Sequence, residues 1–186
     1  MSFLIIGLTG RNASGKGAIA TFLKKKSFQY HSLSDTLRKE LTKKGQKETR
    51  DNLVLIGNEL RYSGGPGVLA DMMIKNLLSP ENHIVDSIRN PFEVNSLRRI
   101  YNNHRFYLIA VDATPEIRFE RLKLRDRVGD ISSWKEFIEQ ELLEEESADV
   151  HEQQLLKTIQ KADFIVDNSG TIKDLESSIA GILDKL

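Results

Sequence analysis

The sequence predicts an α/β protein in which a mostly parallel sheet is covered by helices on both faces. Short apolar runs suited to buried strands alternate with helical patterns from one end of the chain to the other. The first such run, at 3–6, breaks into a glycine-rich turn that leads directly into an amphipathic helix. With 186 residues and no visible linker or repeat, the chain is expected to form one domain, 1–186.

The expected elements follow one another in a regular order. We expect strands at 3–6, 28–33, 83–86, 105–111 and 164–166. Residues suited to helix caps or first turns predict where the helices between them begin. The first helix follows the glycine-rich turn, and the later ones begin at Ser34 or Asp35, Thr49, Val68, Pro91, Thr114-Pro115, Ser133 and Thr171.

Composition restricts the classes of function. Lys plus Arg and Asp plus Glu both number 27, so no bulk charge favours nucleic acid or an anionic membrane as a partner. The chain has no cysteine, which excludes disulfides and thiolate chemistry. No segment is long enough to cross a bilayer, and the apolar run at 3–6 is too short for a signal peptide. We therefore expect a cytoplasmic protein without nucleic-acid or membrane partners; the oligomeric state stays open.

The glycine-rich turn has the features of a phosphate-binding loop. Residues 10–16 match the pattern G-x-x-x-x-G-K. Gly10 and Gly15 permit backbone angles that let successive N–H groups point into one concavity beside the positive end of a helix dipole, and Lys16 adds a full charge. A turn that binds nothing is the alternative. We predict nucleotide contacts at Gly10, Asn12, Ala13, Ser14, Gly15, Lys16, Gly17 and Ala18.

A metal site is expected at the end of the third strand. Gly17 replaces the hydroxyl that usually holds Mg²⁺, although Mg²⁺ often keeps several waters and takes few protein ligands. Asp86 ends a buried strand, where a carboxylate is costly unless it is paired or near a cation. We predict that Asp86 holds Mg²⁺ or one of its waters. The alternative is that backbone amides or Arg89 satisfy it.

Several arginines lie where ligands of an open α/β sheet bind, beyond the carboxyl ends of the strands. Arg38 stands near the predicted start of a helix, where it opposes the dipole and suggests a compensating anion. Asp35 could contact a substrate or simply cap that helix. Arg118, Arg121 and Arg125 share one helical stripe. This stripe could clamp a triphosphate or form an ordinary solvated face.

Other charged and aromatic groups are expected to be structural. Residues 144–146 extend the helix that starts at Ser133 as a solvated acidic face. Trp134 and Phe137 suit ordinary helix packing, and no mixture of aromatic and basic residues suggests RNA binding. The four histidines have no metal-ligand spacing.

Separate segments make the chain similar to the nucleoside monophosphate kinase group of P-loop proteins, with the dephospho-CoA kinases as close relatives. Residues 15–17 resemble the adenylate kinase loop, and residues 33–38 resemble the segment whose arginine holds the acceptor phosphate. Residues 86–89 resemble an acidic strand end followed by a second acceptor arginine, and Arg121 and Arg125 match the arginines at the start of the lid. Residues 162–170 resemble the dephospho-CoA kinase segment beside the adenine, which implies base contacts at Asn168 and Gly170.

The resemblance also implies the organisation of the domain. Residues 57–61 and 86–91 are similar to uncharacterised adenylate-kinase-related proteins and to the kinase-like domain attached to some deoxycytidylate deaminases. The implied fold is a three-layer P-loop NTPase with five parallel strands in the order 2-3-1-4-5. An acceptor-binding helical region at about 35–80 and a short lid at about 121–135 go with it. The implied acceptor contacts are Asp35, Arg38, Arg61 and Arg89.

We therefore expect an ATP-dependent kinase, with Mg²⁺, that acts on a nucleotide-like small molecule such as a (deoxy)nucleoside monophosphate. Phosphoryl transfer needs alignment and positive charge, for which we predict Lys16, Arg38, Asp86, Arg89, Arg121 and Arg125 as catalytic residues. Arg38 and Arg89 favour a phosphate acceptor, whereas Asp35 keeps open a hydroxyl acceptor, as in dephospho-CoA kinase. The other alternative is a regulatory module that binds NTP with slow hydrolysis or none.

Overall fold

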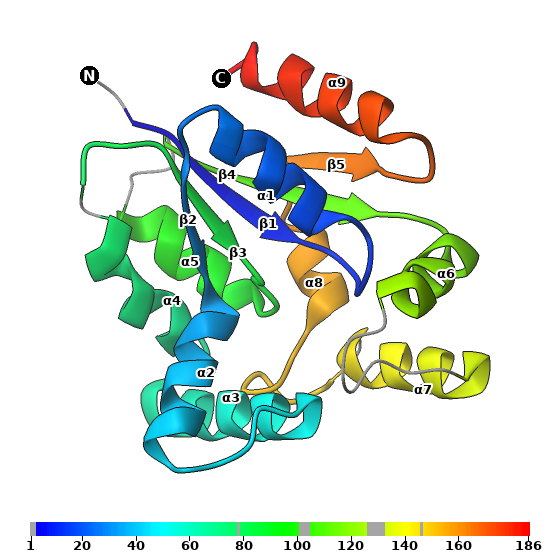
Figure 1. Cartoon of the computed structure of the whole chain (residues 1–186). Coiled ribbons are helices and arrows are strands. Elements are labelled where there is room, and N and C mark those ends of the chain that lie inside the picture. The colour runs from blue at the N-terminus through cyan, green and yellow to red at the C-terminus, as the bar shows by residue number, and fades with distance from the viewer. Residues whose placement is uncertain (1–2, 78, 101–104, 126–132, 146) are drawn as a thin grey trace.

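Five parallel strands form the centre of the protein in a computed structural model that describes residues 3–77, 79–100, 105–125, 133–145 and 147–186. Their order is β2-β3-β1-β4-β5, as the resemblance implied (Figure 1). The strands are β1 (Ile5–Thr9), β2 (Gln29–Ser32), β3 (His83–Asp86), β4 (Phe106–Asp112) and β5 (Phe164–Asp167). The four pairings between neighbouring strands are all parallel, so the carboxyl ends of the strands meet at one edge of the sheet.

Helices occupy the connections between the strands, and one more helix follows β5. They are α1 (Lys16–Lys25), α2 (Leu33–Lys43), α3 (Arg50–Gly64), α4 (Val68–Met73), the 3-10 helix η1 (Ile74–Leu77), α5 (Pro91–Ile100), α6 (Pro115–Arg125), α7 (Trp134–Glu145), α8 (Leu155–Ile159) and α9 (Ile172–Leu183). Within the described part of the chain, no helix is long and apolar enough to cross a membrane.

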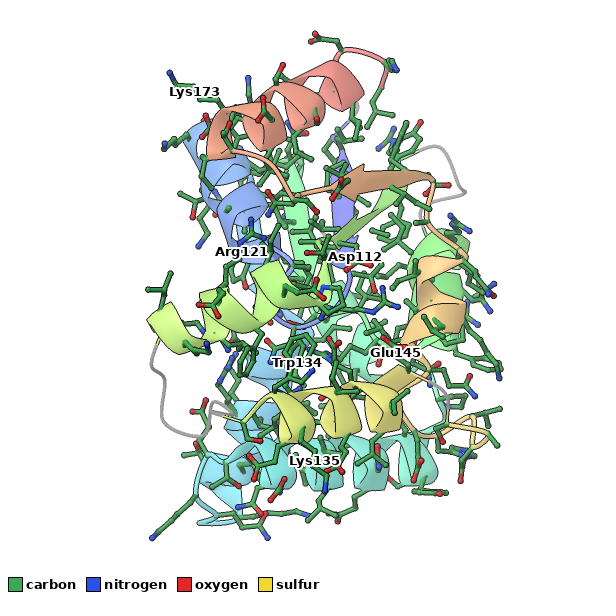
Figure 2. All side chains as sticks on the ribbon, turned by 90° about the vertical axis from the view of Figure 1, so that its right-hand side faces the viewer. Asp112, Arg121, Trp134, Lys135, Glu145 and Lys173 are labelled. Carbon is green, nitrogen blue, oxygen red and sulfur yellow. The ribbon has the colours of Figure 1, made fainter. Side chains whose placement is uncertain are left out.

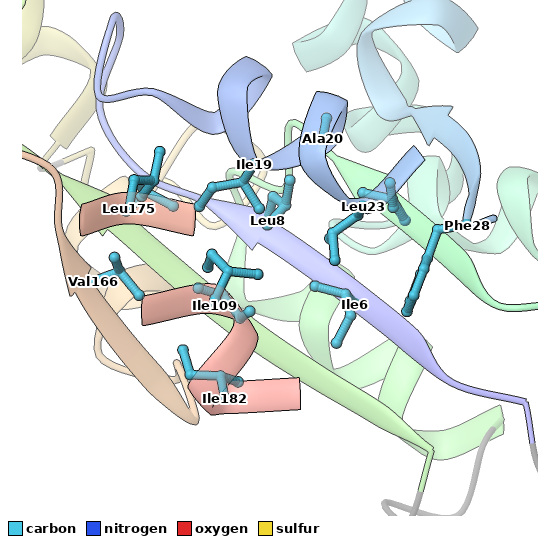
Figure 3. Packing of buried hydrophobic residues seen from close by; sticks show 13 residues of the cluster. Ile6, Leu8, Ile19, Ala20, Leu23, Phe28, Ile109, Val166, Leu175 and Ile182 are labelled. Atoms are coloured by element: carbon cyan, nitrogen blue, oxygen red, sulfur yellow. The ribbon is translucent and has the colours of Figure 1, made fainter. Parts of the chain in front are cut away.

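Alternate residues of the strands belong to two separate hydrophobic cores, one on each face of the sheet. Ile6 and Leu8 pack with apolar residues of α1 and α9 on one face of the sheet (Figure 3). Ile5 points to the other face, where it packs with apolar residues of α2, α4 and α5. Because successive side chains of a strand point to opposite faces, a run such as Ile5-Ile6 serves both layers. Helices on both faces give the predicted three-layer arrangement (Figure 1).

The starts of the helices agree with their caps in most places. Thr49 and Thr171 accept hydrogen bonds from backbone N–H groups of the first turns that follow, as expected. The expected cap of α2 was wrong, because Ser32 accepts from the N–H of Ser34 and the helix begins at Leu33. Arg38 therefore lies in the second turn of α2 and not at its start. The short helix α8 was not expected from the sequence.

A small third cluster joins α6 and α7 to the glycine-rich loop. Phe119, Leu122 and Phe137 are buried together, and Ala13 of the loop packs against them. Figure 2 shows α6, which carries Arg121, next to α7, whose ends are marked by Trp134 and Glu145. Trp134 and Phe137 are packing residues, as expected. The predicted lid at about 121–135 falls partly on 126–132, which lie outside the described residues.

Candidate active site

The backbone of the glycine-rich loop needs its glycines. Gly10 has a φ of +136°, and a Cβ there would lie 2.0 Å from the carbonyl oxygen of Val111. Gly15 caps α1 with a φ of +109°, and its Cβ would lie 1.9 Å from Nδ2 of Asn168. Asn168 Nδ2 in turn donates to the carbonyl oxygen of Ser14 over 2.8 Å. The loop is thus held in a conformation that requires glycine at both positions, as phosphate-binding turns commonly do.

Lys16 follows the loop as the first residue of α1. Its Nζ donates to the carbonyl oxygens of Gly10 and Arg11 over 2.7 and 2.8 Å. Burial and the positive charge of Arg89 lower the pKa of Lys16 to about 8, although Asp86, Glu144 and Asp112 act in the opposite direction. Two cations that repel each other across a cavity favour an anionic ligand between them.

A cavity of about 610 Å³ runs from the loop to α2 and α3. Its described lining residues come from the loop and the start of α1, from the carboxyl ends of β2 and β3, and from α2, α3, α4, α6 and α7. The segments before α3 and before α8 also contribute. The lining carries seven cationic side chains, Lys16, Arg38, Arg50, Arg61, Arg89, Arg121 and Arg125, against three carboxylates, Glu48, Asp86 and Glu144. The chain as a whole is electrically balanced, so positive charge is concentrated in this cavity.

Asp86 lies at the end of β3 with 8% of its surface exposed, inside the cavity. Its Oδ2 accepts a hydrogen bond from the hydroxyl of Tyr30 over 3.0 Å. Burial and the charge of Asp86 raise the pKa of Tyr30. The described residues hold no group of three or more potential metal ligands. A Mg²⁺ ion held by Asp86 would therefore take its other ligands from phosphate oxygens and water, as Mg²⁺ commonly does.

The predicted acceptor residues differ in their surroundings. Arg38 lines the cavity and donates to Asp35 over 2.7 Å and to Glu48 over 2.6 Å. Asp35 is not among the described lining residues. Arg61 reaches the cavity wall but is only 3% exposed, and its Nη2 donates to Glu93 over 2.8 Å. The guanidinium of Arg61 therefore holds α3 against the start of α5 in this structure.

Arg89 and Arg50 share the carboxylate of Glu144, and neither Arg50 nor Glu144 was expected to be a site residue. Nη1 of Arg89 donates to Oε2 of Glu144 over 2.7 Å, and Nε of Arg50 donates to Oε1 of the same carboxylate over 3.1 Å. Glu144 is only 8% exposed, so the expectation of a solvated acidic face was wrong there. Arg50 opens α3, where an arginine opposes the helix dipole. That argument pointed to Arg38 and could have identified Arg50.

The three arginines of the α6 stripe separate. Arg118 is 1% exposed and pairs with Glu141 of α7, so its inclusion in a phosphate clamp was wrong. Arg121 and Arg125 both line the cavity, as a clamp requires. Arg121 Nη2 donates to the carbonyl oxygen of Asn168 over 2.8 Å. Their spacing in the sequence grouped the three arginines together. The neighbours of each side chain in the folded protein decide which of the three line the cavity.

The predicted base contacts lie behind the loop. Asn168 is 3% exposed and supports the carbonyl of Ser14, as described above. Gly170 leads into the cap of α9, where a Cβ would lie 3.0 Å from Oδ2 of Asp174. Neither residue belongs to the described lining of the cavity, and Gly10 does not either. Asn12, Ala13, Ser14, Gly15, Lys16, Gly17 and Ala18 do line it.

Two buried polar atoms of the cavity wall fit a polyphosphate. Ser14 Oγ and Arg121 Nη1 have no hydrogen-bond partner among the described residues, although both residues line the cavity. A buried donor without a partner costs free energy, which phosphate oxygens would recover. The donors of this wall therefore suit ATP, and the single carboxylate of Asp86 suits its Mg²⁺.

Comparisons with known proteins agree with this fold. Residues 6–144 match the AAA domain family. The UPF0200 protein of Methanocaldococcus jannaschii is 33% identical over 187 residues, covering 98% of this chain and 90% of that protein. The structure of TT1252 from Thermus thermophilus aligns with a TM-score of 0.64 at 20% identity, over 100% of this chain and 99% of the other.

Shikimate kinase from Bacteroides thetaiotaomicron aligns with a TM-score of 0.59 at 13% identity, over 97% of this chain and 98% of that one. At such identities these two structures establish the fold alone, which is a P-loop NTPase fold. The sequence relationships go further: the chain belongs to the UPF0200 family and carries an AAA domain over residues 6–144.

Proposed function

We propose that this protein is an ATP-dependent phosphotransferase that acts on a nucleotide-like small molecule, with a (deoxy)nucleoside monophosphate as the leading acceptor. One observation carries the proposal: a single cavity joins the phosphate loop to Arg38 of α2 and Arg50 of α3. A donor and an acceptor can therefore lie in one space, which phosphoryl transfer requires. The structural similarity to a protein named shikimate kinase supports a small-molecule kinase.

The residues divide the work by position. The loop amides, Lys16 and Arg121 would bind the donor phosphates, and Asp86 would hold Mg²⁺ or one of its waters. ATP with Mg²⁺ supplies a phosphoryl group whose bond to the β-phosphate oxygen breaks as the acceptor oxygen bonds to phosphorus. Arg125 and Arg89 add positive charge beside the transferring group. Tyr30 would orient Asp86 through its hydrogen bond.

The acceptor chemistry follows from the opposite wall. Arg38, Arg50 and Arg89 line that part of the cavity, and cations suit an acceptor that already carries a phosphate. A hydroxyl acceptor, as in dephospho-CoA kinase, would gain from a carboxylate base. Asp35, the residue predicted for that role, is paired with Arg38 outside the lining. We therefore favour the phosphate acceptor over the hydroxyl.

A second candidate function is an NTP-binding regulatory module or a slow NTPase. Gly17 favours it, because this position offers no hydroxyl to Mg²⁺. The ammonium of Lys16 also donates to carbonyl oxygens of the loop itself. A module that binds nucleotide without transferring phosphate would tolerate both features.

Product analysis distinguishes these functions. The protein is incubated with Mg²⁺ and ATP and with each of a panel of nucleoside monophosphates, with dephospho-CoA, or with water alone. Stoichiometric phosphorylated acceptor supports the kinase, and the identity of the product decides between phosphate and hydroxyl. Free phosphate alone supports an NTPase, and tight binding without product supports a regulatory module. Lys16→Ala should abolish transfer and serves as the control for contaminating kinases.

A further inference from the structure

Arg50 and Arg89 come from different elements and converge on one carboxylate. Arg50 opens α3, and Arg89 lies between β3 and α5. The two donate to different oxygens of Glu144, Arg50 to Oε1 and Arg89 to Oε2. All three side chains line the cavity. Two guanidinium groups on the two oxygens of one anion form the arrangement with which arginines bind a phosphate or carboxylate ligand.

Glu144 is poorly suited to its own helix. It is the second-last residue of α7, where a negative charge meets the negative end of the helix dipole. Its side chain is only 10% exposed, so desolvation adds to the cost. Burial opposes its ionisation, but the charges of Arg89 and Arg50 outweigh burial and lower its pKa below the usual range. The two arginines, and not α7, explain a carboxylate at this position.

Charges hold much of α7 to the rest of the protein. Phe137 is its buried apolar residue, whereas Leu142 and Leu143 are exposed. Glu141 and Glu145 form ion pairs with arginines of α6 and of the phosphate loop. An ion pair can be exchanged for a ligand anion, but a buried apolar face has no such substitute. The carboxyl end of α7 is therefore an element that a ligand can release.

We propose that Glu144 is an internal stand-in for the anionic group of the acceptor. Arg50 and Arg89 form the oxyanion site for that group, and an incoming phosphate or carboxylate displaces Glu144 and releases the carboxyl end of α7. The proposal rests on the proposed kinase function for the identity of the ligand, and it adds Arg50 to the acceptor residues. Acceptor binding then competes with Glu144, so the apparent Kd is the intrinsic Kd divided by the fraction of molecules with free arginines.

Inorganic phosphate is the probe, titrated by calorimetry with and without Mg²⁺ and a non-hydrolysable ATP analogue in the loop. Glu144→Gln keeps the size of the side chain and removes its charge. We expect this variant to bind phosphate about tenfold more tightly than the wild type, because the competing anion is gone. The double variant that carries both Glu144→Gln and Arg50→Gln should lose this increase in phosphate affinity. A parallel titration with acetate separates the two ligand classes. If Glu144→Gln gains as much affinity for acetate as for phosphate, the ligand group is assigned as a carboxylate. If it gains affinity for phosphate alone, the group is assigned as a phosphate.

Glu141→Gln is the matched control, because it lies one turn earlier in α7 and also loses an ion pair. It releases Arg118, which is not among the described lining residues of the cavity. Its phosphate affinity should equal that of the wild type. Equal affinity in Glu144→Gln and wild type overturns the proposal, and so does an equal gain in Glu141→Gln.

Trp134 reports the movement of α7. It is the one tryptophan of the chain, and its ring lies 5.3 Å from that of Phe119 and 5.5 Å from that of Phe137. Saturating phosphate should shift the Trp134 emission of the wild type toward that of ligand-free Glu144→Gln. Where ligand-free Glu144→Gln differs from the wild type in emission, unchanged emission of the phosphate-bound wild type refutes displacement. If no phosphorylated product forms but Glu144→Gln binds phosphate more tightly than the wild type, the proposed kinase function is refuted and the displacement of Glu144 is not.

Discussion

Raising the pH from 7 to 9 should weaken nucleotide binding about tenfold, because Lys16 loses its charge within this range. In the free protein the pKa of Lys16 is lowered from 10.5 to about 8. A bound polyphosphate stabilises the charged ammonium and raises this pKa again, so binding above pH 8 must take up a proton. The Kd is then multiplied by the factor 1 + 10^(pH − pKa). With a pKa of about 8 this factor is about 1.1 at pH 7 and about 11 at pH 9.

Calorimetric titration with Mg²⁺ and a non-hydrolysable ATP analogue at constant ionic strength measures the effect. Phosphate groups complete their second ionisation at a pKa of about 6, so the ligand contributes little above pH 7.5. Lys16→Arg is the control, because a guanidinium stays charged throughout this range. A wild-type Kd that is the same at pH 7 and pH 9, or that changes equally in Lys16→Arg, would refute the role assigned to Lys16.

Three substitutions and one control variant test the rest of the structure. Gly15→Ala should lower the Tm and weaken nucleotide binding at least tenfold, because the strained φ and the contact with Asn168 cost about 1–3 kcal/mol; unchanged melting would contradict the loop geometry. A Cβ at Gly17 would meet nothing within 4 Å, so Gly17→Thr should keep or raise the Tm, and its added hydroxyl should lower the Mg²⁺ concentration that nucleotide binding needs; a lower Tm would argue against the open space at this site. Glu93→Ala leaves Arg61 buried and unpaired, which should cost about 3–5 kcal/mol and lower the Tm by about 10 °C in thermal denaturation. Glu59→Ala, which breaks an exposed pair with Lys44, should change the free energy of unfolding by less than about 1 kcal/mol, and equal losses in both variants would disprove the reasoning.

The sequence alone determined the sheet and the place of the phosphate loop. The spacing of apolar residues indicates which faces of the strands and helices are buried. The resemblance supplied the strand order, which the structure confirms. Gly10, Gly15 and Lys16 could be singled out because a strand, a turn and a helix meet there in consecutive residues. Thr49 and Thr171 could be identified as caps because a cap bonds to a backbone group only a few residues away. The phosphate loop and the two caps are local in the chain.

Only the tertiary structure decided which charged residues reach the cavity. Glu144 meets Arg50 across 94 positions of sequence and Arg89 across 55, whereas the sequence around it resembles any acidic helix end. Arg118 and Arg121 have the spacing of one stripe, yet one is buried against Glu141 and the other lines the cavity. Electrostatic pairing depends on the distance between the charges in space and on their burial. The spacing of residues along a helix gives no information about either. The chain therefore specifies its phosphate loop in eleven consecutive residues, 7–17, but specifies its acceptor wall only through the packing of α3, α6 and α7 around the sheet.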